Sequence, residues 1–286
     1  MDWGKVDDRE SVAAIRRAVD LGVNFFDTAD VYGLGRSERI LAEALGPQRR
    51  DVVIATKFGV NWQEVPGGRA KTFFDSSPAH VLRALDASLR RLKLDCIPLY
   101  YIHWPDPNTS IDSTMETLMR CQAAGKILHI GVSNFSPDEI RQACLIQPLT
   151  CVQAHFNLLR REAETTLLPC CRELNIALIA YGPLAQGLLT GKYGADAKFN
   201  SDDRRSRLPH FSKDALSNNL EVVKKLRNVG SQSGKTPGQV AIRWILDNPS
   251  ISSAIVGLKS TKQLDENLGA MDWHLTSEQI SYLTGA

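Results

Sequence analysis

The chain has 286 residues and a formal net charge of +2, with 43% hydrophobic and 23% charged residues. These values are close to the globular average and exclude a disordered chain, a coiled coil and a collagen-like repeat. No stretch reaches the ~18 uninterrupted apolar residues of a membrane span, the short acidic start is unlike a signal peptide, and the near-neutral charge favours neither nucleic acid nor a membrane surface as a partner.

Short apolar, β-branched runs alternate with amphipathic helical segments along the whole chain. A helix begins near Asp8, before the first of these runs. Seven runs are short enough to be strands that are buried on both faces. They are residues 23–28, 52–57, 96–103, 127–133, 150–157, 176–181 and 253–258.

The helices between these runs have readable N-termini. Ser77-Pro78 combines an N-cap with proline at the first helical position. Ser136 and Glu139 form a capping box, because the Glu139 side chain can reach back to the Ser136 amide. Similar starts occur at Thr236-Pro237, Ser260 and Thr276. We expect a C-terminal helix over about 277–284.

The repeated alternation of strand and helix predicts an α/β fold with a parallel sheet and helices outside it. The alternatives are an open doubly wound sheet and a (β/α)₈ TIM barrel. A doubly wound dinucleotide-binding sheet has G-x-G-x-x-G after its first strand. Here Gly33-Leu34-Gly35 lacks the third glycine and lies in a loop. We therefore predict a single barrel domain over residues 1–286, with seven recognisable strands.

The segment 192–212 has no apolar period and contains a charge cluster, Asp202-Asp203-Arg204-Arg205-Ser206-Arg207. A connection of this length inside a compact domain is usually functional or mobile. The cluster is either a solvated charged run or part of a lid over an anionic cofactor. We predict a mobile loop that covers a cofactor.

The cysteines indicate the cellular setting, and the spacing of the histidines bears on metal binding. Most of the six cysteines lie in apolar runs, and none forms a C-x-x-C pair. We expect free thiols and a cytoplasmic location, since disulfide frameworks belong to small secreted domains. The six histidines show no H-E-x-x-H or H-x-H spacing, so we expect no metal site.

Polar residues end the predicted strands, and in a (β/α)₈ barrel these ends surround the active site. The first three strands end at Asp27, Lys57 and His103, and Tyr32 follows Asp27 in a glycine-containing loop. Each residue alone has a structural interpretation: a buried ion pair, a core histidine or a rim aromatic. Their joint appearance at three successive strand ends favours an active site.

The chemistry of these four residues is coherent. A phenol has a pKa of about 10, which a neighbouring ammonium lowers. Lys57 can supply that ammonium beside Tyr32, and Asp27 can supply the counter-charge that it needs. His103 can donate a hydrogen bond to a substrate oxygen. The set therefore predicts protonation of a carbonyl oxygen while another group attacks the carbon. Trp104 is either rim packing or the apolar wall of a substrate pocket, and we assign it to substrate binding.

The other strand ends suggest a dinucleotide site. Tyr181 can offer a flat face to an aromatic ring, and the turn 182–188 can cradle a pyrophosphate with its amides. Lys259 and Ser260 begin a helix whose N-terminus favours a phosphate. Glu266-Asn267 lies two turns into that helix and can meet an adenine edge. Groups suited to a carboxamide come from Ser133, Asn134 and Gln153.

Six motifs, in order along nearly the whole chain, resemble those of the aldo-keto reductase family. The resemblance is strongest to its bacterial branch related to potassium-channel β subunits. The motifs are 22–33 (GVNFFDTADVYG), 54–57 (IATK), 99–105 (LYYIHWP), 131–135 (GVSNF), 180–192 (AYGPLAQGLLTGK) and 263–267 (QLDEN).

This resemblance implies a barrel that binds NADPH without a Rossmann fold and transfers a hydride between the cofactor and an aldehyde or ketone. It implies a catalytic tetrad in which Tyr32 is the general acid in reduction and the base in the reverse direction. The tetrad would be Asp27, Tyr32, Lys57 and His103. The nicotinamide would stack on Tyr181 and be held by Ser133, Asn134 and Gln153. The pyrophosphate would be lined by Gly182, Leu184, Gly187 and Leu188. The adenosine end would be held by Lys259, Gln263, Glu266 and Asn267.

The chain departs from the family pattern in three places. The N-terminal hairpin and first barrel strand of the family have no counterpart before the helix near Asp8, which agrees with the count of seven strands and exposes two sheet edges. His155-Phe156 stands where this branch often has tyrosine at the second position. The motif for the 2′-phosphate has Lys259 and Gln263 but no arginine. NADPH is expected because of Lys259, and NADH is the alternative because the arginine is absent.

The sequence is compatible with three functions. The expected one is an NADPH-dependent reductase of a small carbonyl compound, with specificity set by the loops after Trp62 and Trp104 and by 192–212. The alternative is a redox-sensing, β-subunit-like binding protein with slow or no turnover, and the intact tetrad counts against it. A Schiff-base aldolase with Lys57 as nucleophile is disfavoured, because pairing with Asp27 keeps that amine charged. No feature of the sequence specifies an oligomeric state.

Overall fold

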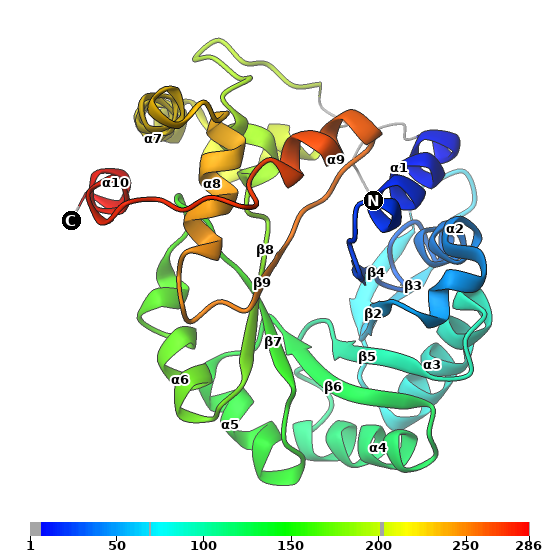
Figure 1. The fold of residues 1–286 in the computed structure, drawn as a ribbon. Helices are drawn as coiled ribbons and strands as arrows, with labels where there is room; N and C mark the ends of the chain where they lie inside the picture. Colours follow the sequence, from blue (N-terminus) through cyan, green and yellow to red (C-terminus); the bar gives the residue numbers. More distant parts are fainter. Residues whose placement is uncertain (1–6, 69, 201–202, 286) are drawn as a thin grey trace. The chain divides into compact units, whose positions relative to one another are not determined.

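The computed structural model of the protein describes residues 7–68, 70–200 and 203–285 (Figure 1). Ser201 and Asp202 of the predicted loop lie outside the described residues. The chain divides into two compact units. The first unit comprises Ser11–Gln153 and Glu173–Ala177. The second comprises Ala154–Arg172 together with residues 7–10 and the described residues from 178 onward.

Strands and helices alternate through the first unit. Its parallel strands are β1 (Phe25–Asp27), β2 (Val53–Phe58), β5 (Ile97–Ile102), β6 (Ile127–Ser133) and the start of β7 (Cys151–His155). Its helices are most of α1 (Asp8–Asp20), α2 (Arg36–Leu45), the 3₁₀-helix η1 (Gly46–Arg50), α3 (Pro78–Leu92), α4 (Ile111–Ala123) and α5 (Pro137–Ile146). In Figure 1 the helices α2 to α5 lie outside the strands of this unit.

The second unit contains the end of β7 and most of the elements that follow it. Its strands are β8 (Ala177–Tyr181, from Leu178) and β9 (Ser253–Ile255). Its α-helices are α6 (Leu167–Glu173, to Arg172), α7 (Lys213–Ser233), α8 (Pro237–Leu246), α9 (Thr261–Leu268) and α10 (Ser277–Thr284). Its 3₁₀-helices are η2 (Glu162–Glu164), η3 (Ala185–Thr190), η4 (Arg204–Arg207) and η5 (Pro209–Phe211).

The parallel strands follow each other in sequence order, β1-β2-β5-β6-β7-β8-β9. A doubly wound sheet reverses its strand order at a switch point, whereas a (β/α)₈ barrel adds each strand next to the previous one. The observed order is therefore that of the barrel class. Each strand overlaps its predicted range, and the parallel sheet has seven strands within the described residues.

The N-terminal signals of the helices are confirmed. Ser77 caps α3 and accepts a hydrogen bond from the His80 amide at 3.3 Å. Ser136 and Glu139 form both bonds of the predicted capping box on α5. A capping box gives hydrogen-bond partners to two backbone amides at the start of a helix that have none within the helix. These sequences therefore set where their helices begin.

One hairpin was not predicted. Strands β3 (Val60–Gln63) and β4 (Lys71–Phe74) pair antiparallel directly after β2. Gly59 connects β2 to β3 with a φ of 100°, which favours glycine. All four residues of β4 are exposed, so the hairpin lacks the buried apolar run by which the other strands were recognised. Its Val60 packs with Ala29, Val31, Tyr32 and Trp62.

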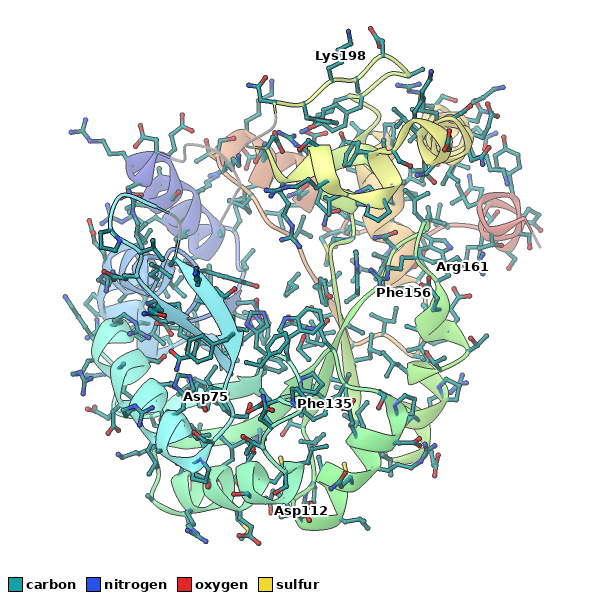
Figure 2. All side chains as sticks on the ribbon, turned by 180° about the vertical axis from the view of Figure 1, so that it is seen from behind. Asp75, Asp112, Phe135, Phe156, Arg161 and Lys198 are labelled. Atoms are coloured by element: carbon teal, nitrogen blue, oxygen red, sulfur yellow. The ribbon has the colours of Figure 1, made fainter. Side chains whose placement is uncertain are left out.

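Phe156 has an apolar structural role in the second unit. Its fully buried ring stacks on Trp244 with ring centroids 5.2 Å apart. The guanidinium of Arg161 lies 5.8 Å from the centroid of the same indole, and Figure 2 shows Phe156 and Arg161 on one segment of this unit. A hydroxyl at position 156 would need a partner in this apolar contact, which explains why phenylalanine suits the position.

The cysteines are free thiols, and Cys121, Cys151, Cys170 and Cys171 are buried. Among the described residues, no three His, Cys, Asp or Glu side chains are grouped as a metal ion would require.

None of the helices in the described part of the chain has the length and apolar composition needed to cross a bilayer.

Gly131 fixes the position of a tyrosine in the centre of the first unit. It pairs with Tyr101 across β5 and β6. A Cβ at Gly131 would lie 2.6 Å from Cε1 of Tyr101 and 3.0 Å from the carbonyl oxygen of Cys151. Tyr101 is fully buried, so neither its ring nor the backbone of β7 can yield without disturbing the core.

We expect Gly131→Ala to destabilise the protein by about 1–3 kcal/mol, because it overpacks this contact. A chain of this size should then lose roughly 2–4 °C in melting temperature for each kcal/mol. Thermal unfolding followed by circular dichroism measures the effect. Gly257→Ala is the control, since a Cβ there meets nothing within 4 Å. Equal melting temperatures for the two variants would contradict the prediction.

Candidate active site

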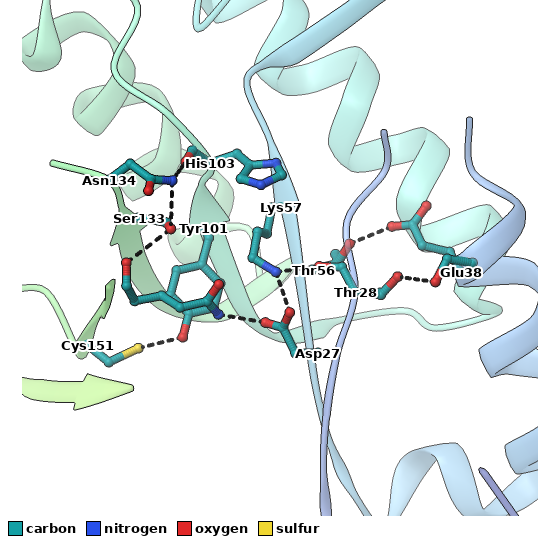
Figure 3. Close-up of polar contacts among 12 residues, drawn as sticks. Asp27, Thr28, Glu38, Thr56, Lys57, Tyr101, His103, Ser133, Asn134 and Cys151 are labelled. Atoms are coloured by element: carbon teal, nitrogen blue, oxygen red, sulfur yellow. Dashed lines mark hydrogen bonds and ion pairs between the residues drawn. The ribbon is translucent and has the colours of Figure 1, made fainter. Parts of the chain in front are cut away.

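An ion pair between β1 and β2 forms the centre of the candidate site. Nζ of Lys57 lies 2.5 Å from Oδ1 of Asp27 and donates to the carbonyl oxygen of Thr28 at 2.8 Å. The Lys57 side chain is 0% exposed and that of Asp27 is 9% exposed. Oδ2 of Asp27 accepts a hydrogen bond from Nε2 of Gln153 at 2.7 Å. Figure 3 shows these contacts together. Asp27 thus has a partner on each oxygen.

Tyr32 lies beside this ion pair. The Lys57 ammonium is 5.4 Å from the centroid of the Tyr32 ring and 5.7 Å from that of Tyr101. Tyr32 also meets His103 edge to face, with ring centroids 5.7 Å apart. The structure therefore brings together all four residues that the sequence predicted for the tetrad, and they come from successive parallel strands and the loop after the first.

His103 is a buried, neutral imidazole. Burial, and next the positive charge of Lys57, lower its pKa from the ordinary 6.5 to about 3. Its Nδ1 has no hydrogen-bond partner within the described structure. A buried polar atom without a partner is rare and points to a ligand or a water that completes it. The ring can therefore serve as a neutral hydrogen-bonding group.

A chain of hydrogen bonds joins the three residues predicted to hold a carboxamide. Asn134, which has a φ of 62°, donates through Nδ2 to the carbonyl oxygen of His103 at 2.9 Å and to Oγ of Ser133 at 3.1 Å. Ser133 donates to the carbonyl oxygen of Gln153 at 3.0 Å. These residues are linked to His103 and, through Gln153, to Asp27. The link from Gln153 to Asp27 was not predicted from the sequence.

Trp104 follows His103 and is 39% exposed. Its ring lies 6.2 Å from that of Phe74 on β4, measured between centroids. Trp62 packs against the same small apolar cluster as Tyr32, so these rings supply apolar surface near the tetrad. The unpredicted hairpin thus contributes two of the aromatic residues around the site.

Tyr181 ends β8 in the second unit and stacks on His155, with centroids 4.9 Å apart and planes 14° apart. Nδ1 of His155 lies 3.1 Å from the guanidinium of Arg160. Burial, and next the charge of Arg160, lower the His155 pKa from 6.5 to about 4. Gly182 has a φ of 67°, and a Cβ there would lie 2.8 Å from Nε2 of His155. Glycine is therefore required next to this stack.

The predicted pyrophosphate turn folds as η3. Gly187 has a φ of 92°, and a Cβ there would lie 3.0 Å from Cε and 3.1 Å from Nζ of Lys192. The Lys192 ammonium beside this turn was not singled out from the sequence, although it ends motif 180–192. The amides of Ala185, Gly187 and Leu189 donate to the carbonyl oxygens of Gly182 and Leu184. Leu188 is fully buried and Leu184 is half-buried.

The start of α9 holds the residues predicted for the adenosine end. Ser260 is its N-cap and accepts a hydrogen bond from the Gln263 amide at 3.4 Å. Oε1 of Gln263 accepts from the Lys259 amide at 2.7 Å. Burial, and next the charge of Arg205, lower the pKa of the Lys259 ammonium. Glu266 and Asn267 lie further along α9.

The described part of the predicted loop packs on its own aromatic residues. Tyr193, Phe199 and Phe211 meet edge to face, with centroids 4.8 to 5.5 Å apart. The Arg205 guanidinium lies 4.9 Å from the Phe199 centroid and pairs with Asp203. Arg205 and its partner Asp203 both interact electrostatically with Lys259, so this part of the loop lies near the start of α9.

The residues of each unit, taken separately, fit one part of a nicotinamide dinucleotide. The first unit offers hydroxyl and amide groups next to a hydrogen-bonding atom of His103 that lacks a partner. The second unit offers a stacked aromatic face, two glycines at positions that a Cβ would fill, and Lys192 and Lys259 for phosphates. Such donor sets match a carboxamide, an aromatic ring and phosphate oxygens.

Comparison with known proteins identifies the family. A family model described as "Aldo/keto reductase family" matches residues 1–286. The chain is 36% identical over 279 residues to the aldo-keto reductase YhdN of Bacillus subtilis, which covers 96% of this chain and 83% of that protein. It is 34% identical over 289 residues to the aldo-keto reductase yakc [NADP(+)] of Schizosaccharomyces pombe, covering 99% of this chain and 84% of the relative.

Solved structures confirm the fold class. The glycerol dehydrogenase AKR11B4 of Gluconobacter oxydans matches with a TM-score of 0.92 and 37% identity, covering 98% of this chain and 86% of that chain. The holo form of aldo-keto reductase AKR11C1 of Bacillus halodurans has the same fold, with a TM-score of 0.81, 24% identity, and coverage of 98% and 88%. The predicted (β/α)₈ TIM-barrel class is thereby confirmed. The chain belongs to the aldo/keto reductase family and is an NAD(P)H-dependent oxidoreductase that acts on carbonyl or alcohol groups.

Proposed function

We propose that this protein reduces an aldehyde or ketone to the alcohol with NADPH, and catalyses the reverse reaction, with Tyr32 as general acid and base. The observation that carries the proposal is the Tyr32 ring 5.4 Å from the buried Lys57 ammonium and 5.7 Å from the neutral His103. Proton transfer by a positioned side chain contributes typically 10²–10⁴-fold to a rate.

Each tetrad residue has a distinct task in this mechanism. In reduction the Tyr32 phenol donates its proton to the carbonyl oxygen, and in oxidation the phenolate takes it back. The Lys57 ammonium stabilises the phenolate, because opposite charges in a dry site attract strongly. Asp27 holds that ammonium in place, and His103 orients the substrate oxygen through a neutral hydrogen bond.

When NADPH is bound, its nicotinamide supplies the hydride. We assign the carboxamide to Ser133, Asn134 and Gln153, and the face of the ring to Tyr181. Gly182, Leu184, Gly187 and Leu188 line the pyrophosphate, with Lys192 adding a positive charge. The adenosine end is assigned to Lys259, Gln263, Glu266 and Asn267.

NADPH is preferred over NADH in this proposal because Lys259 and Arg205 offer positive charge for a 2′-phosphate. The S. pombe relative is named for NADP(+), which supports the same choice.

The 37%-identical G. oxydans structure is named a glycerol dehydrogenase, so glyceraldehyde is a reasonable first substrate. Trp104, Phe74 and Trp62 favour an apolar group next to the carbonyl, so benzaldehyde is the second. The cytoplasmic location and the relationship to potassium-channel β subunits stay predictions.

Tyr32→Phe removes the proton donor and keeps the ring. We expect it to lower kcat by about 10²–10⁴-fold with either aldehyde, since among the described residues the other phenol beside Lys57 is that of the buried Tyr101. The dissociation constant of NADPH, measured by quenching of tryptophan fluorescence, should change by less than about threefold.

Tyr282→Phe is the matched control, because the Tyr282 hydroxyl accepts an exposed hydrogen bond from Asn228 on α7 and Tyr282 is 45% exposed. Full activity of Tyr32→Phe would remove Tyr32 from the mechanism. If the wild type binds NADPH tightly but turns over neither aldehyde, this result would support the alternative function, a redox-sensing binding protein with slow or no turnover.

The neutral state of His103 makes a separate pH prediction. Its folded-state pKa of about 3 lies below the unfolded value of 6.5, so the unfolded chain binds the proton more readily. As the pH falls from 6.5 toward 3, this histidine therefore lowers the free energy of unfolding, by up to about 1.4 kcal/mol per pH unit. Above pH 6.5 His103 is unprotonated in both the folded and the unfolded chain, so it does not change the free energy of unfolding there.

Urea unfolding of wild type and His103→Gln at about pH 7 and about pH 5 measures this effect. The wild type should lose more stability on acidification than the variant, which has no titratable group at that position. His155 is present in both proteins and cancels in the comparison. Equal losses would show that His103 titrates near its ordinary value.

A further inference from the structure

Strand β2 presents two consecutive polar side chains to opposite faces. Thr56 and Lys57 are both 0% exposed, and successive side chains of a strand point to opposite sides. Lys57 pairs with Asp27 on one side. On the other, Oγ1 of Thr56 donates to Oε1 of Glu38 at 2.7 Å. Figure 3 shows both contacts.

Glu38 is a carboxylate in the first turn of α2 and is 0% exposed. Its Oε2 lies 2.5 Å from Nε of Arg91 on α3. Arg91 also donates to Oγ of Ser88 at 3.1 Å. Burying a carboxylate is costly unless it is paired and hydrogen-bonded, and Glu38 meets this condition with one partner on each oxygen.

The loop that carries Tyr32 runs between these two anchors. It starts at Asp27, held by Lys57, and ends at Glu38, held by Thr56 and Arg91. Within it the Ser37 amide donates to the carbonyl oxygen of Tyr32 at 3.2 Å. Oγ1 of Thr28 donates to Oγ of Ser37 at 2.8 Å and joins the two ends.

The end of the loop is also fitted to Arg91 by shape. Gly35 has a φ of 83°, and a Cβ there would lie 2.6 Å from Cδ of Arg91. The arginine side chain therefore lies directly against the loop backbone. None of Thr56, Glu38 or Arg91 has a tetrad side chain as a partner in the contacts described. Their effect on catalysis would pass through the loop or, for Thr56, also through its neighbour Lys57 on β2.

We propose that Thr56, Glu38 and Arg91 form a buried anchor that positions Tyr32 for proton transfer, so that β2 holds both ends of the Tyr32 loop. They are positioning residues for the reaction and touch neither substrate nor cofactor. The proposal rests on the proposed role of Tyr32. A displacement of about 1 Å at a reacting group can cost 10²-fold in rate, so a loosened loop end should slow turnover without weakening cofactor binding.

The test uses Thr56→Val, which keeps the shape of the side chain and removes the hydrogen bond from β2 to Glu38. Thr56→Ser restores the hydroxyl. With glyceraldehyde and benzaldehyde, we expect Thr56→Val to lower kcat about 10- to 100-fold, with KM and the dissociation constant of NADPH within about twofold. Thr56→Ser should recover kcat to within about threefold of the wild type.

Thr117→Val is the matched control. Thr117 is a buried threonine on α4 whose hydroxyl donates to the carbonyl oxygen of Ser113 at 2.9 Å. It should lose a similar hydrogen bond and keep kcat. Hydrogen–deuterium exchange of peptides covering 28–38 gives a second readout: exchange should quicken in Thr56→Val and stay unchanged in Thr117→Val.

Unchanged kcat in Thr56→Val, or an equal fall in Thr117→Val, would overturn the proposed anchor while leaving the role of Tyr32 intact. Unchanged exchange in 28–38 would also overturn it. Full activity of Tyr32→Phe, by contrast, would remove the proposed function itself, and the exchange experiment would still decide whether Thr56 anchors the loop.

Discussion

The buried ammonium of Lys57 is the constraint on which the first unit depends. Removing a charge from water costs several kcal/mol even after relaxation. This cost is offset by the Asp27 carboxylate and the Thr28 carbonyl oxygen, with two aromatic rings nearby. Loss of one partner would leave an unpaired buried charge, at about 3–5 kcal/mol. The end of β1 and the start of the loop after it must therefore stay where they can pair with the Lys57 side chain.

The neighbours of this ion pair follow from the same need. Asp27 has a second oxygen to satisfy, and Gln153 on β7 does so. Tyr101 faces Lys57 from β5, and its ring fits only because residue 131 on β6 has no side chain. Its hydroxyl lies 3.0 Å from Sγ of Cys151. Adjacent strands β1, β2, β5, β6 and β7 thus each contribute a residue whose identity is set by the packing or pairing around one charge.

The sequence predicted what depends on local pattern. Buried parallel strands need continuous apolar runs, and the tetrad follows because Asp27, Lys57 and His103 interrupt such runs at their ends. The β3–β4 hairpin was missed because its second strand is exposed. The bond between Thr56 and Glu38 was missed for a different reason: a glutamate in the first turn of a helix is ordinarily solvated, and only the tertiary fold places Arg91 and Thr56 against it. The stack of His155 on Tyr181 joins residues from two strands and has no local pattern either.

The charge states around Tyr32 complete the argument for its role. Burial, and next the carboxylate of Glu38, raise the pKa of Asp30 to about 8, so this carboxyl is neutral at pH 7. Burial lowers the pKa of His103 to about 3, so the imidazole is neutral as well. Neither group then adds a charge of its own beside Tyr32, whereas the Lys57–Asp27 ion pair does. Lys57 already pairs with Asp27, so a Tyr32 phenolate would be a second anion that this ammonium stabilises, and the loop anchored at Glu38 holds the phenol there.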